Sequence, residues 1–279
     1  MAITREQFSF VKRLVFDKAK IVLEPGKEYL VESRLAALAS QEGLGSVSAL
    51  LDALHSKPTA TLEKQVVDAM TTNETSWFRD VKPFDALRKI VLPALIEQRK
   101  ATRSLVIWSL ACSSGQEPYS TAMVIKEHFP DLANWSIQIL AGDLSPTVVE
   151  KARQGRYSQL DVNRGLPASM LARHFDRDGS NFRVKPDIRR WVTFREMNLA
   201  GPWPALPRPD VVFLRNVMIY LDVATRRSIL AHVSGHLVPD GYLFLGAGET
   251  TLNLDPSFER IDNDRAGCFQ LINRPKCRP

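Results

Sequence analysis

Residues 105–119 read Leu-Val-Ile-Trp-Ser-Leu-Ala-Cys-Ser-Ser-Gly-Gln-Glu-Pro-Tyr, and this stretch decides the fold class. The apolar run from Leu105 to Ala111 is typical of a central parallel strand that is buried on both faces. A short polar turn follows, and we expect Pro118 at the first position of a helix that ends near His128. A strand, a turn and a helix in this order predict an α/β sheet.

The same alternation continues toward the C-terminus. It predicts strands at Ile137–Ala141, Val211–Leu214 and Tyr242–Leu245. One helix is expected to start at Ser145, and another to carry the apolar residues from Ile229 to Leu237. A hairpin is expected of Phe258–Ile261 with Cys268–Ile272. This is the pattern of a doubly wound sheet, whose ligands bind at the carboxyl ends of the strands. Residues 155–195 interrupt it. They predict an inserted subdomain with a short helix and two or three antiparallel strands, one of them at Arg190–Phe194.

The first 72 residues predict helices only. Thr4 and Gln7 have the spacing of a capping box, and apolar residues recur at helical spacing in four short segments. The segments are marked by Phe8 to Val15, Val31 to Leu38, Val47 to Leu54 (after a capping Ser46) and Leu62 to Met70. We therefore expect an all-α domain at residues 1–72 and a second domain at residues 73–279, with the insert at about 155–195.

Composition limits the class of protein. The chain has 279 residues, of which 44% are hydrophobic and 24% charged, as in a soluble globular protein. No stretch reaches the roughly 18–20 apolar residues of a membrane span, and Met1 to Glu6 lack the pattern of a secretory signal. Cys112, Cys268 and Cys277 are odd in number and lack CxxC spacing, so we expect neither a disulfide framework nor a metal site. These features predict a cytoplasmic protein that does not insert into a membrane.

The positive charge is concentrated in one segment. The chain has a net charge of +6, whereas residues 1–72 contain nine basic and nine acidic side chains. Residues 151–195 contain eleven basic and four acidic side chains, a net charge of +7. This segment is either a docking surface for an acidic partner or a solvated surface, and both readings stay open. It lacks the aromatic ladder of a single-strand nucleic-acid binder, so no nucleic-acid partner is expected.

The turn after the first strand restricts the ligand. It contains only Gly115, where a dinucleotide fingerprint has three glycines, and it lacks the lysine of a P-loop. An adenosine-like ligand without phosphates fits these residues, and S-adenosylmethionine meets that description. Asp143, after the second strand, would accept hydrogen bonds from the ribose hydroxyls, and Glu117 from the ammonium group or the ribose. The alternative for each carboxylate is a helix or loop cap.

Several motifs resemble the CheR family of chemotaxis receptor methyltransferases. They are Thr72-Asn-Glu-Thr-Ser-Trp-Phe-Arg79, Ala111-Cys-Ser-Ser-Gly-Gln-Glu-Pro-Tyr-Ser120, Gly142-Asp143, Met197-Asn-Leu199 and Phe213-Leu-Arg-Asn-Val-Met-Ile-Tyr220. The resemblance covers nearly the whole chain. It implies a Rossmann-like sheet that binds S-adenosylmethionine and an enzyme that esterifies glutamates in the cytoplasmic domain of methyl-accepting chemotaxis receptors. The cofactor contacts that it implies are Asn73, Thr75, Arg79, Glu117, Asp143, Asn198, Leu199, Arg215 and Asn216.

The resemblance also implies that Arg79 and Tyr220 line the methyl-transfer site, where a guanidinium or a phenol can orient a carboxylate. For Tyr220, the alternative is a buried packing aromatic. For the whole chain, two alternatives are a non-catalytic module that senses the cofactor and a methyltransferase that acts on RNA or small molecules. Residues 215–220 read Arg-Asn-Val-Met-Ile-Tyr, which differs from the Asn/Asp-Pro-Pro-Tyr/Phe of enzymes that methylate base amines.

Two segments depart from the family pattern. Some members use a Gly-x-Gly loop of the insert to bind a pentapeptide tether of the receptor, but residues 175–182 contain one glycine. We therefore expect a member that does not depend on the tether. Family members often carry several arginines on the second helix, whereas residues 34–41 contain only Arg34. Basic residues that could replace that face for receptor docking, or simply be solvated, are Lys12, Arg13, Lys18, Lys20 and Lys27.

Overall fold

The computed structural model describes residues 3–261 and 265–272, so Cys277 lies outside the described residues. The chain forms two compact units. The first contains the residues up to Thr72 together with Tyr220–Thr225, and the second contains Asn73–Ile219 and the residues from Arg226 onward. Within the described ranges, every helix is too short or too polar to cross a lipid bilayer.

The first unit is helical, as predicted. Its helices are α1 (Arg5–Ala19), α2 (Glu28–Gln41), α3 (Val47–Ser56) and α4 (Ala60–Met70). The predicted capping box is present, because the Thr4 side chain accepts from Gln7 N–H and the Gln7 side chain accepts from Thr4 N–H. Ser46 caps α3 as expected. The short segment Tyr220–Thr225 joins this unit through its backbone, since Val22 N–H donates to Tyr220 O (2.9 Å).

The only arginine of α2 is engaged within the helical unit. Arg34 Nη1 donates to Met70 O at 2.5 Å, and its Nη2 donates to Thr72 Oγ1 at 2.7 Å. Both acceptors lie at or just beyond the end of α4. The guanidinium therefore satisfies backbone and side-chain oxygens where this helix ends, which is a structural use of the side chain.

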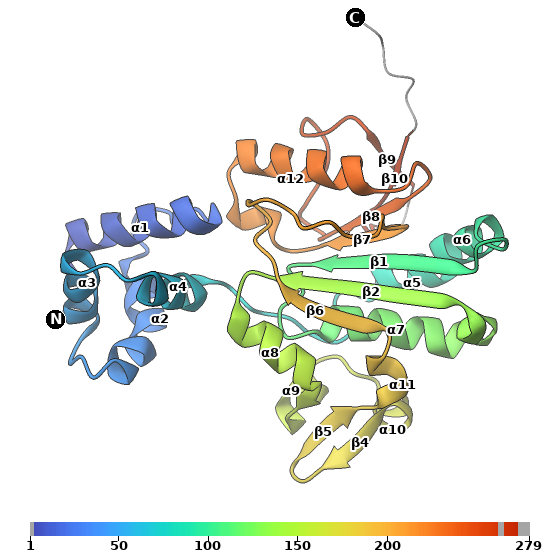
Figure 1. The fold of residues 1–279 in the computed structure, drawn as a ribbon, viewed down its shortest axis with the longest axis horizontal. Helices are drawn as coiled ribbons and strands as arrows, with labels where there is room; N and C mark the ends of the chain where they lie inside the picture. The colour runs from blue at the N-terminus through green and yellow to red at the C-terminus, as the bar shows by residue number, and fades with distance from the viewer. Residues whose placement is uncertain (1–2, 262–264, 273–279) are drawn as a thin grey trace, which may run out of the picture. The chain divides into compact units, whose positions relative to one another are not determined.

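The second unit contains a seven-stranded sheet in the order β6-β2-β1-β7-β8-β10-β9 (Figure 1). The strands are β1 (Ser104–Leu110), β2 (Ser136–Asp143), β6 (Val192–Glu196), β7 (Val211–Leu214), β8 (Tyr242–Leu245), β9 (Phe258–Arg260) and β10 (Cys268–Leu271). The first five in spatial order are parallel, and the last two form the predicted antiparallel hairpin. The carboxyl ends of the five parallel strands therefore meet at one edge of the sheet.

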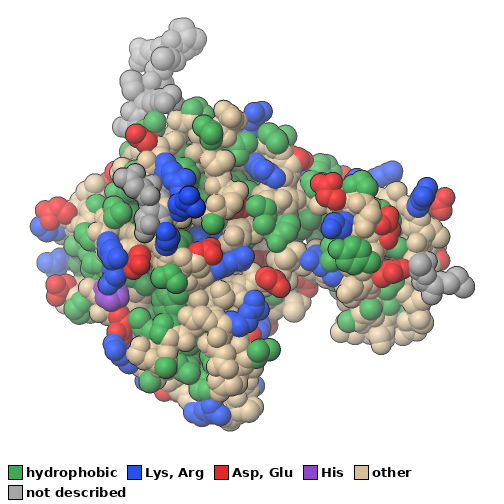
Figure 2. Space-filling view, turned by 180° about the vertical axis from the view of Figure 1, so that it is seen from behind, with side chains coloured by type: hydrophobic (Ala, Val, Ile, Leu, Met, Phe, Trp, Pro, Cys, Tyr) green, Lys and Arg blue, Asp and Glu red, His purple; other side chains and the backbone are tan. Residues whose placement is uncertain are grey.

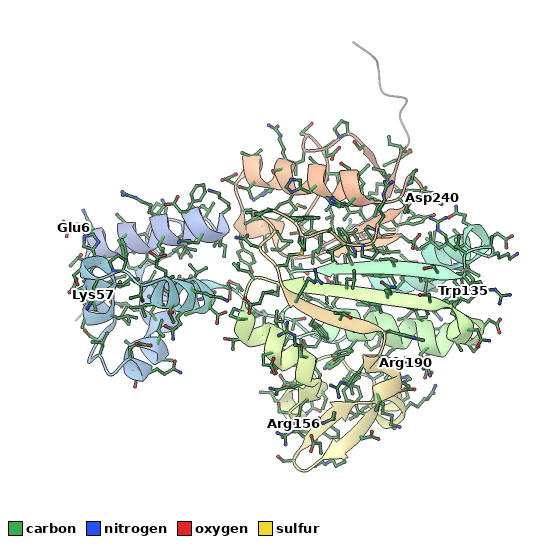
Figure 3. The ribbon with its side chains drawn as sticks, in the orientation of Figure 1. Glu6, Lys57, Trp135, Arg156, Arg190 and Asp240 are labelled. Carbon is green, nitrogen blue, oxygen red and sulfur yellow. The ribbon has the colours of Figure 1, made fainter. Side chains whose placement is uncertain are left out.

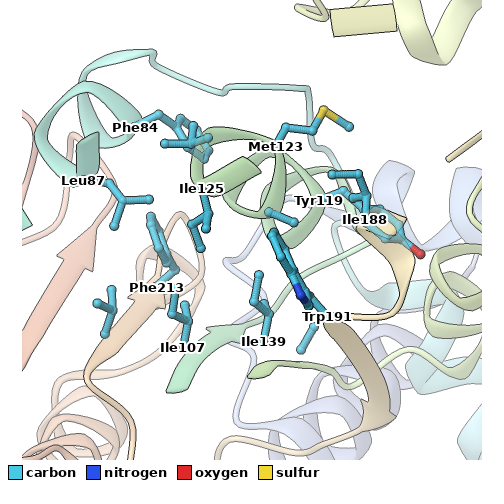
Figure 4. Packing of buried hydrophobic residues seen from close by; sticks show 14 of the residues in the cluster. Phe84, Leu87, Ile107, Tyr119, Met123, Ile125, Ile139, Ile188, Trp191 and Phe213 are labelled. Atoms are coloured by element: carbon cyan, nitrogen blue, oxygen red, sulfur yellow. The ribbon is translucent and has the colours of Figure 1, made fainter. Parts of the chain in front are cut away.

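The central strands are buried on both faces. On one face, Ile107 and Phe213 belong to the core that includes Ile125 of α7 (Gln116–His128) (Figure 4). On the other face, the Trp108 ring lies 5.6 Å from the ring of His236, which ends α12 (Val223–His236). Helices on both faces of an apolar strand are what the run at residues 105–111 predicted.

Helix α7 begins earlier than the sequence suggested. It starts at Gln116, so Pro118 is its third residue and not its first. Gly115 precedes it with φ of +90°, and a Cβ there would lie 2.9 Å from Ala152 Cβ. The proline is tolerated because the first N–H groups of a helix have no intrahelical acceptor. Gly115 is therefore required by a left-handed turn and by close packing on α8 (Pro146–Gln154).

The insert contains a three-stranded antiparallel sheet in the order β3-β5-β4. Its elements are β3 (Arg156–Tyr157), α9 (Gln159–Asn163), α10 (Ala168–His174), β4 (Phe175–Asp178), β5 (Asn181–Val184) and α11 (Pro186–Arg189). The strand expected at Arg190–Phe194 is not part of this sheet. It is β6, which pairs in parallel with β2 in the main sheet. Its apolar Val192 and Phe194 alternate with the polar Thr193 and Arg195, which fits an edge strand of either sheet, so sequence periodicity could not distinguish the two.

An ion-pair cluster holds the edge of the sheet opposite the carboxyl ends. Arg99 follows α6 (Leu92–Gln98), which continues α5 (Lys82–Ala86) through a π-helical turn (Leu87–Val91). Its guanidinium donates to Asp210 Oδ1 (2.8 Å) and to both carboxylate oxygens of Asp240, which is labelled in Figure 3. The hydrogen bond from Arg99 holds the pKa of Asp240 below its usual value. Arg99 is thus paired with two carboxylates that precede neighbouring strands.

Candidate functional site

Three neighbouring strands end side by side at the carboxyl edge of the sheet. Leu110, the last residue of β1, pairs with Gly142 of β2 and with Leu214 of β7. The chain segments that follow these residues therefore start next to one another. This is where a doubly wound sheet binds its ligand.

The backbone at this edge is unusually strained for residues other than glycine. Left-handed φ values occur at Ala111 (55°), Ser113 (49°) and Asn216 (59°), directly after β1 and β7. Such conformations cost about 1–3 kcal/mol each and persist where surrounding contacts enforce them. Clustering of strained residues at one end of a sheet points to a functional site.

Asp143 joins two of the loops. Its Oδ2 accepts from Ser113 N–H at 2.7 Å, and its Oδ1 accepts from Ser145 N–H at 3.0 Å. The residue is 7% exposed. The structure therefore supports the predicted position of this carboxylate at the end of β2, and it adds a loop-organising role. A carboxylate has about four acceptor positions, so it can hold the loops and accept from a ligand as well.

Arg215 lies at the centre of a charge cluster that contains the largely buried Glu117 and the exposed Asp80. Its Nη1 donates to Glu117 Oε2 at 2.9 Å, and its Nη2 donates to Asp80 Oδ2 at 2.7 Å and to Arg79 O at 2.9 Å. The side chain of Arg215 is 1% exposed and that of Glu117 is 12% exposed. The guanidinium thus ties the segment at residues 79–80 to the first turn of α7. Its Nε is buried and has no hydrogen-bond partner among the described residues.

Glu117 is held by neighbours on both oxygens. Ser109 Oγ donates to Oε1 at 2.9 Å, while Arg215 binds Oε2. Burial raises the pKa of Glu117, against the lowering effects of Arg215, of the Ser109 hydrogen bond and of Arg79. The carboxylate is therefore placed at the mouth of α7, as predicted, with its orientation fixed by the strand and by the arginine.

The segment at residues 73–81 lies along the same site. Ser113 Oγ donates to Asn73 O (2.8 Å), and Phe78 N–H donates to Ser120 Oγ (3.1 Å). Arg79 Nη1 donates to Glu74 O at 3.0 Å, and its half-buried side chain lies close enough to Glu117 to act on its charge. Thr75 is half-buried in the same segment. Left-handed backbone recurs here, with positive φ at Phe78, Asp80 and Val81.

Asn198 and Leu199 follow β6, next to β2. Met197 N–H donates to Asp143 O at 2.8 Å, which brings the start of this turn to the site. Asn198 Oδ1 accepts from Ala200 N–H (3.0 Å), and Leu199 is 9% exposed. These contacts close the turn locally, as expected for a strand exit.

Tyr220 differs from the other predicted residues. It ends the 3-10 turn Met218–Tyr220 after β7 and is half-buried. Tyr220 belongs to the helical unit. The remaining predicted residues all belong to the sheet-containing unit.

Three residues that shape this site were not predicted from the sequence. Asp80 and Ser109 bind the Arg215–Glu117 pair, as described above. Glu249, after β8, accepts hydrogen bonds from backbone N–H groups that follow β7. The sequence pattern that could have predicted Glu249 is an acidic residue in a glycine-containing turn directly after a buried strand. That turn lies at the same edge of the sheet as Asp143.

The chemistry of the site suits a polar, phosphate-free ligand. It offers the Asp143 carboxylate and the unsatisfied Nε of Arg215. The described residues contain no group of three or more His, Cys, Asp or Glu side chains that could hold a metal ion. Ribose hydroxyls fit the first group, and an α-carboxylate fits the second, so these residues fit S-adenosylmethionine.

Comparison with known proteins identifies the family. Residues 73–266 match the CheR methyltransferase SAM binding domain, and residues 6–71 match the CheR methyltransferase all-alpha domain. Chemotaxis protein methyltransferase 1 of Pseudomonas aeruginosa is 42% identical over 265 residues, which cover 94% of this chain and 96% of that protein. Chemotaxis protein methyltransferase Cher2 of Pseudomonas putida is 42% identical, over 92% of this chain and 93% of its own. The chain therefore belongs to the CheR family of S-adenosylmethionine-dependent methyltransferases.

Proposed function

We propose that this enzyme methylates glutamate side chains in the cytoplasmic domain of methyl-accepting chemotaxis receptors, giving glutamate methyl esters and S-adenosylhomocysteine in the cytoplasm. The observation that carries the proposal is the buried Asp143 carboxylate at the end of β2, in a chain whose relatives are named chemotaxis protein methyltransferases. We assign residues 1–72 to the helical domain. The methyltransferase domain is residues 73–279, with its insert at about 155–195.

Three of the proposed cofactor contacts have a defined role in this scheme. Asp143 accepts from the ribose, and Arg215 Nε donates to the α-carboxylate. Glu117 accepts from the ammonium group or the ribose, and it also orients Arg215, whose Nη1 donates to Glu117 Oε2 at 2.9 Å. The other proposed contacts, at the ends of the surrounding loops, are Asn73, Thr75, Arg79, Asn198, Leu199 and Asn216.

The chemistry requires orientation more than proton transfer. S-adenosylmethionine supplies a methyl group that its sulfonium has already activated. A glutamate carboxylate has an unperturbed pKa of about 4.3, so the acceptor is ionised at neutral pH and needs no general base. The residues of the chain must then align the acceptor oxygen with the methyl group. They must do so with few hydrogen bonds, because a strongly solvated carboxylate is a weaker nucleophile.

Radiolabelled methyl transfer tests the function directly. Receptor-containing membranes are incubated with labelled S-adenosylmethionine and the purified chain, and the label is then released with mild base. Volatile methanol is expected, because a carboxyl ester hydrolyses under these conditions. Label that survives base would indicate an RNA or small-molecule methyltransferase. Cofactor binding without any transfer would indicate a non-catalytic module.

Arg79 and Tyr220 are the proposed groups that orient the acceptor. Arg79→Ala is expected to lower kcat about tenfold, equivalent to about 1.4 kcal/mol, because a charged donor to the carboxylate is lost. Tyr220→Phe should lose less, since it removes one neutral hydrogen bond. Initial rates with receptor membranes measure both. Wild-type turnover of Arg79→Ala, with unchanged cofactor affinity, would remove Arg79 from the reaction.

Receptor recognition is proposed to be independent of a tether peptide. The β4–β5 turn contains Gly179 and lacks the Gly-x-Gly element of tether-dependent members. Titration calorimetry with a receptor C-terminal pentapeptide should therefore show no micromolar binding. A micromolar dissociation constant would contradict the proposal.

The insert is also proposed to dock an acidic surface. Part of its charge is paired locally, since Asp178 binds both Arg156 (3.0 Å) and Arg183 (2.8 Å). Blue basic side chains nevertheless occur over the face of the molecule in Figure 2, including the lower lobe that the insert forms. With Arg34 bound to the end of α4, the lysines and arginine of residues 12–27 are the proposed receptor-facing alternative on the helical domain.

A further inference from the structure

One carboxylate holds the turn that follows β7. Glu249 Oε1 accepts from Val217 N–H (3.0 Å) and Met218 N–H (2.7 Å). Its Oε2 accepts from Asn216 N–H (2.8 Å) and Gly246 N–H (2.7 Å). Four backbone amides therefore converge on a single side chain. Hydrogen bonds from N–H groups to an ionised carboxylate are stronger than those between neutral groups.

Three of these amides are consecutive and belong to the candidate site. They follow Arg215 directly, and Asn216 among them has φ of 59°. Consecutive backbone N–H groups that point the same way form a concavity that binds an anion. Glu249 supplies that anion from the neighbouring strand end, so it enforces the left-handed conformation of Asn216.

The packing around Gly246 strengthens this arrangement. A Cβ at this position would lie 2.7 Å from Asn216 Nδ2 and 2.8 Å from Glu249 Oε2. Glu249 N–H also donates to Gly246 O at 2.9 Å. The glycine thus lets the side chain of Asn216 and the carboxylate of Glu249 pack against the backbone after β8.

We propose that Glu249 is a positioning residue for methyl transfer, acting through the turn of residues 216–218. The proposal rests on the proposed function, in which Asn216 contacts the cofactor. It assigns to Glu249 no contact with the reactants. A competing reading is that the four amides form a carboxylate site for the acceptor, which Glu249 blocks. Four donors would solvate an acceptor oxygen strongly, which opposes its attack on the methyl group.

Glu249→Gln tests the proposal, with Glu259→Gln as the matched control. Glutamine presents one oxygen, and its amide nitrogen would face N–H donors. We expect kcat to fall and the dissociation constant of S-adenosylhomocysteine to rise, each about tenfold, while KM for the receptor stays within about twofold. Glu259 is exposed in β9, so the control loses the same charge without these changes. Glu249→Asp, which is one methylene shorter, should recover only part of the loss.

Two further measurements keep the test decisive. Hydrogen exchange should show faster exchange of the amides of residues 216–218 in Glu249→Gln, with the rest of the sheet unchanged. Gly246→Ala disturbs the same contacts from the opposite side and should reproduce the kinetic pattern, which decides the matter if Glu249→Gln fails to fold. Unchanged or faster turnover in both variants would overturn the proposal. Failure of the wild-type chain to methylate receptors would instead refute the proposed function, while cofactor affinity and exchange still report on Glu249.

Discussion

Asp143→Ala is expected to weaken the binding of S-adenosylmethionine and S-adenosylhomocysteine about a hundredfold. A hydrogen bond to a charged group contributes about 1.5–3 kcal/mol, and two ribose hydroxyls would donate to this carboxylate. A loss of about 2.8 kcal/mol corresponds to a hundredfold change in the dissociation constant. Titration calorimetry with S-adenosylhomocysteine measures the effect without a methyl acceptor, so it does not depend on the identity of the receptor.

The control must separate loss of a ligand contact from loss of loop order. Asp143 also accepts from Ser113 and Ser145 N–H, and alanine removes those bonds as well. Asp143→Asn retains one oxygen and the side-chain volume, so it should bind with intermediate affinity. Asp176→Ala, which removes an exposed carboxylate from the insert, should leave the affinity unchanged. Binding by Asp143→Ala that equals the wild type would exclude Asp143 from the ribose site.

The elements that are coded by short-range patterns could be predicted from the sequence. The capping box of α1 uses residues three apart, and β1 was marked by an unbroken apolar run. Both signals act within a few residues, so no knowledge of tertiary contacts was required. The strand β6 shows the limit of such reasoning. Its period of two is the same whether it pairs with β2 or with the insert, and only the tertiary partner decides.

The site illustrates the same limit. The positions of Asp143 and Glu117 followed from the strand ends, whereas the selection of Asn73, Thr75 and Asn198 depended on family resemblance. Arg215 was expected only as a cofactor contact, yet it binds Glu117, which is 98 residues away in sequence. Glu249 was missed for the same physical reason. Three of its four partners lie 31 to 33 residues away, and a lone acidic residue in a turn has many alternative roles.

Arg215→Met is expected to destabilise the fold strongly and to abolish most activity. Removing one partner of a buried ion pair costs about 3–5 kcal/mol, because the other charge is left buried without compensation. Here that charge is Glu117, whose side chain is 12% exposed. In a domain of this size 1 kcal/mol shifts the melting temperature by about 2–4 °C, so thermal denaturation should show a loss of about 10 °C. The segment at residues 79–80, which Arg215 binds, should become more accessible to protease.

The pH dependence of that loss identifies its cause. Burial already raises the pKa of Glu117, and removal of Arg215, which lowers it, must raise it further. A carboxyl group whose pKa is higher in the folded state than in the unfolded state destabilises the fold increasingly as pH rises above the unfolded value. The deficit of Arg215→Met relative to wild type should therefore be larger at pH 8 than at pH 5. Arg190→Met, which removes an exposed arginine labelled in Figure 3, should show neither the deficit nor its pH dependence. A deficit independent of pH would mean that lost packing, and not the stranded Glu117 charge, accounts for it.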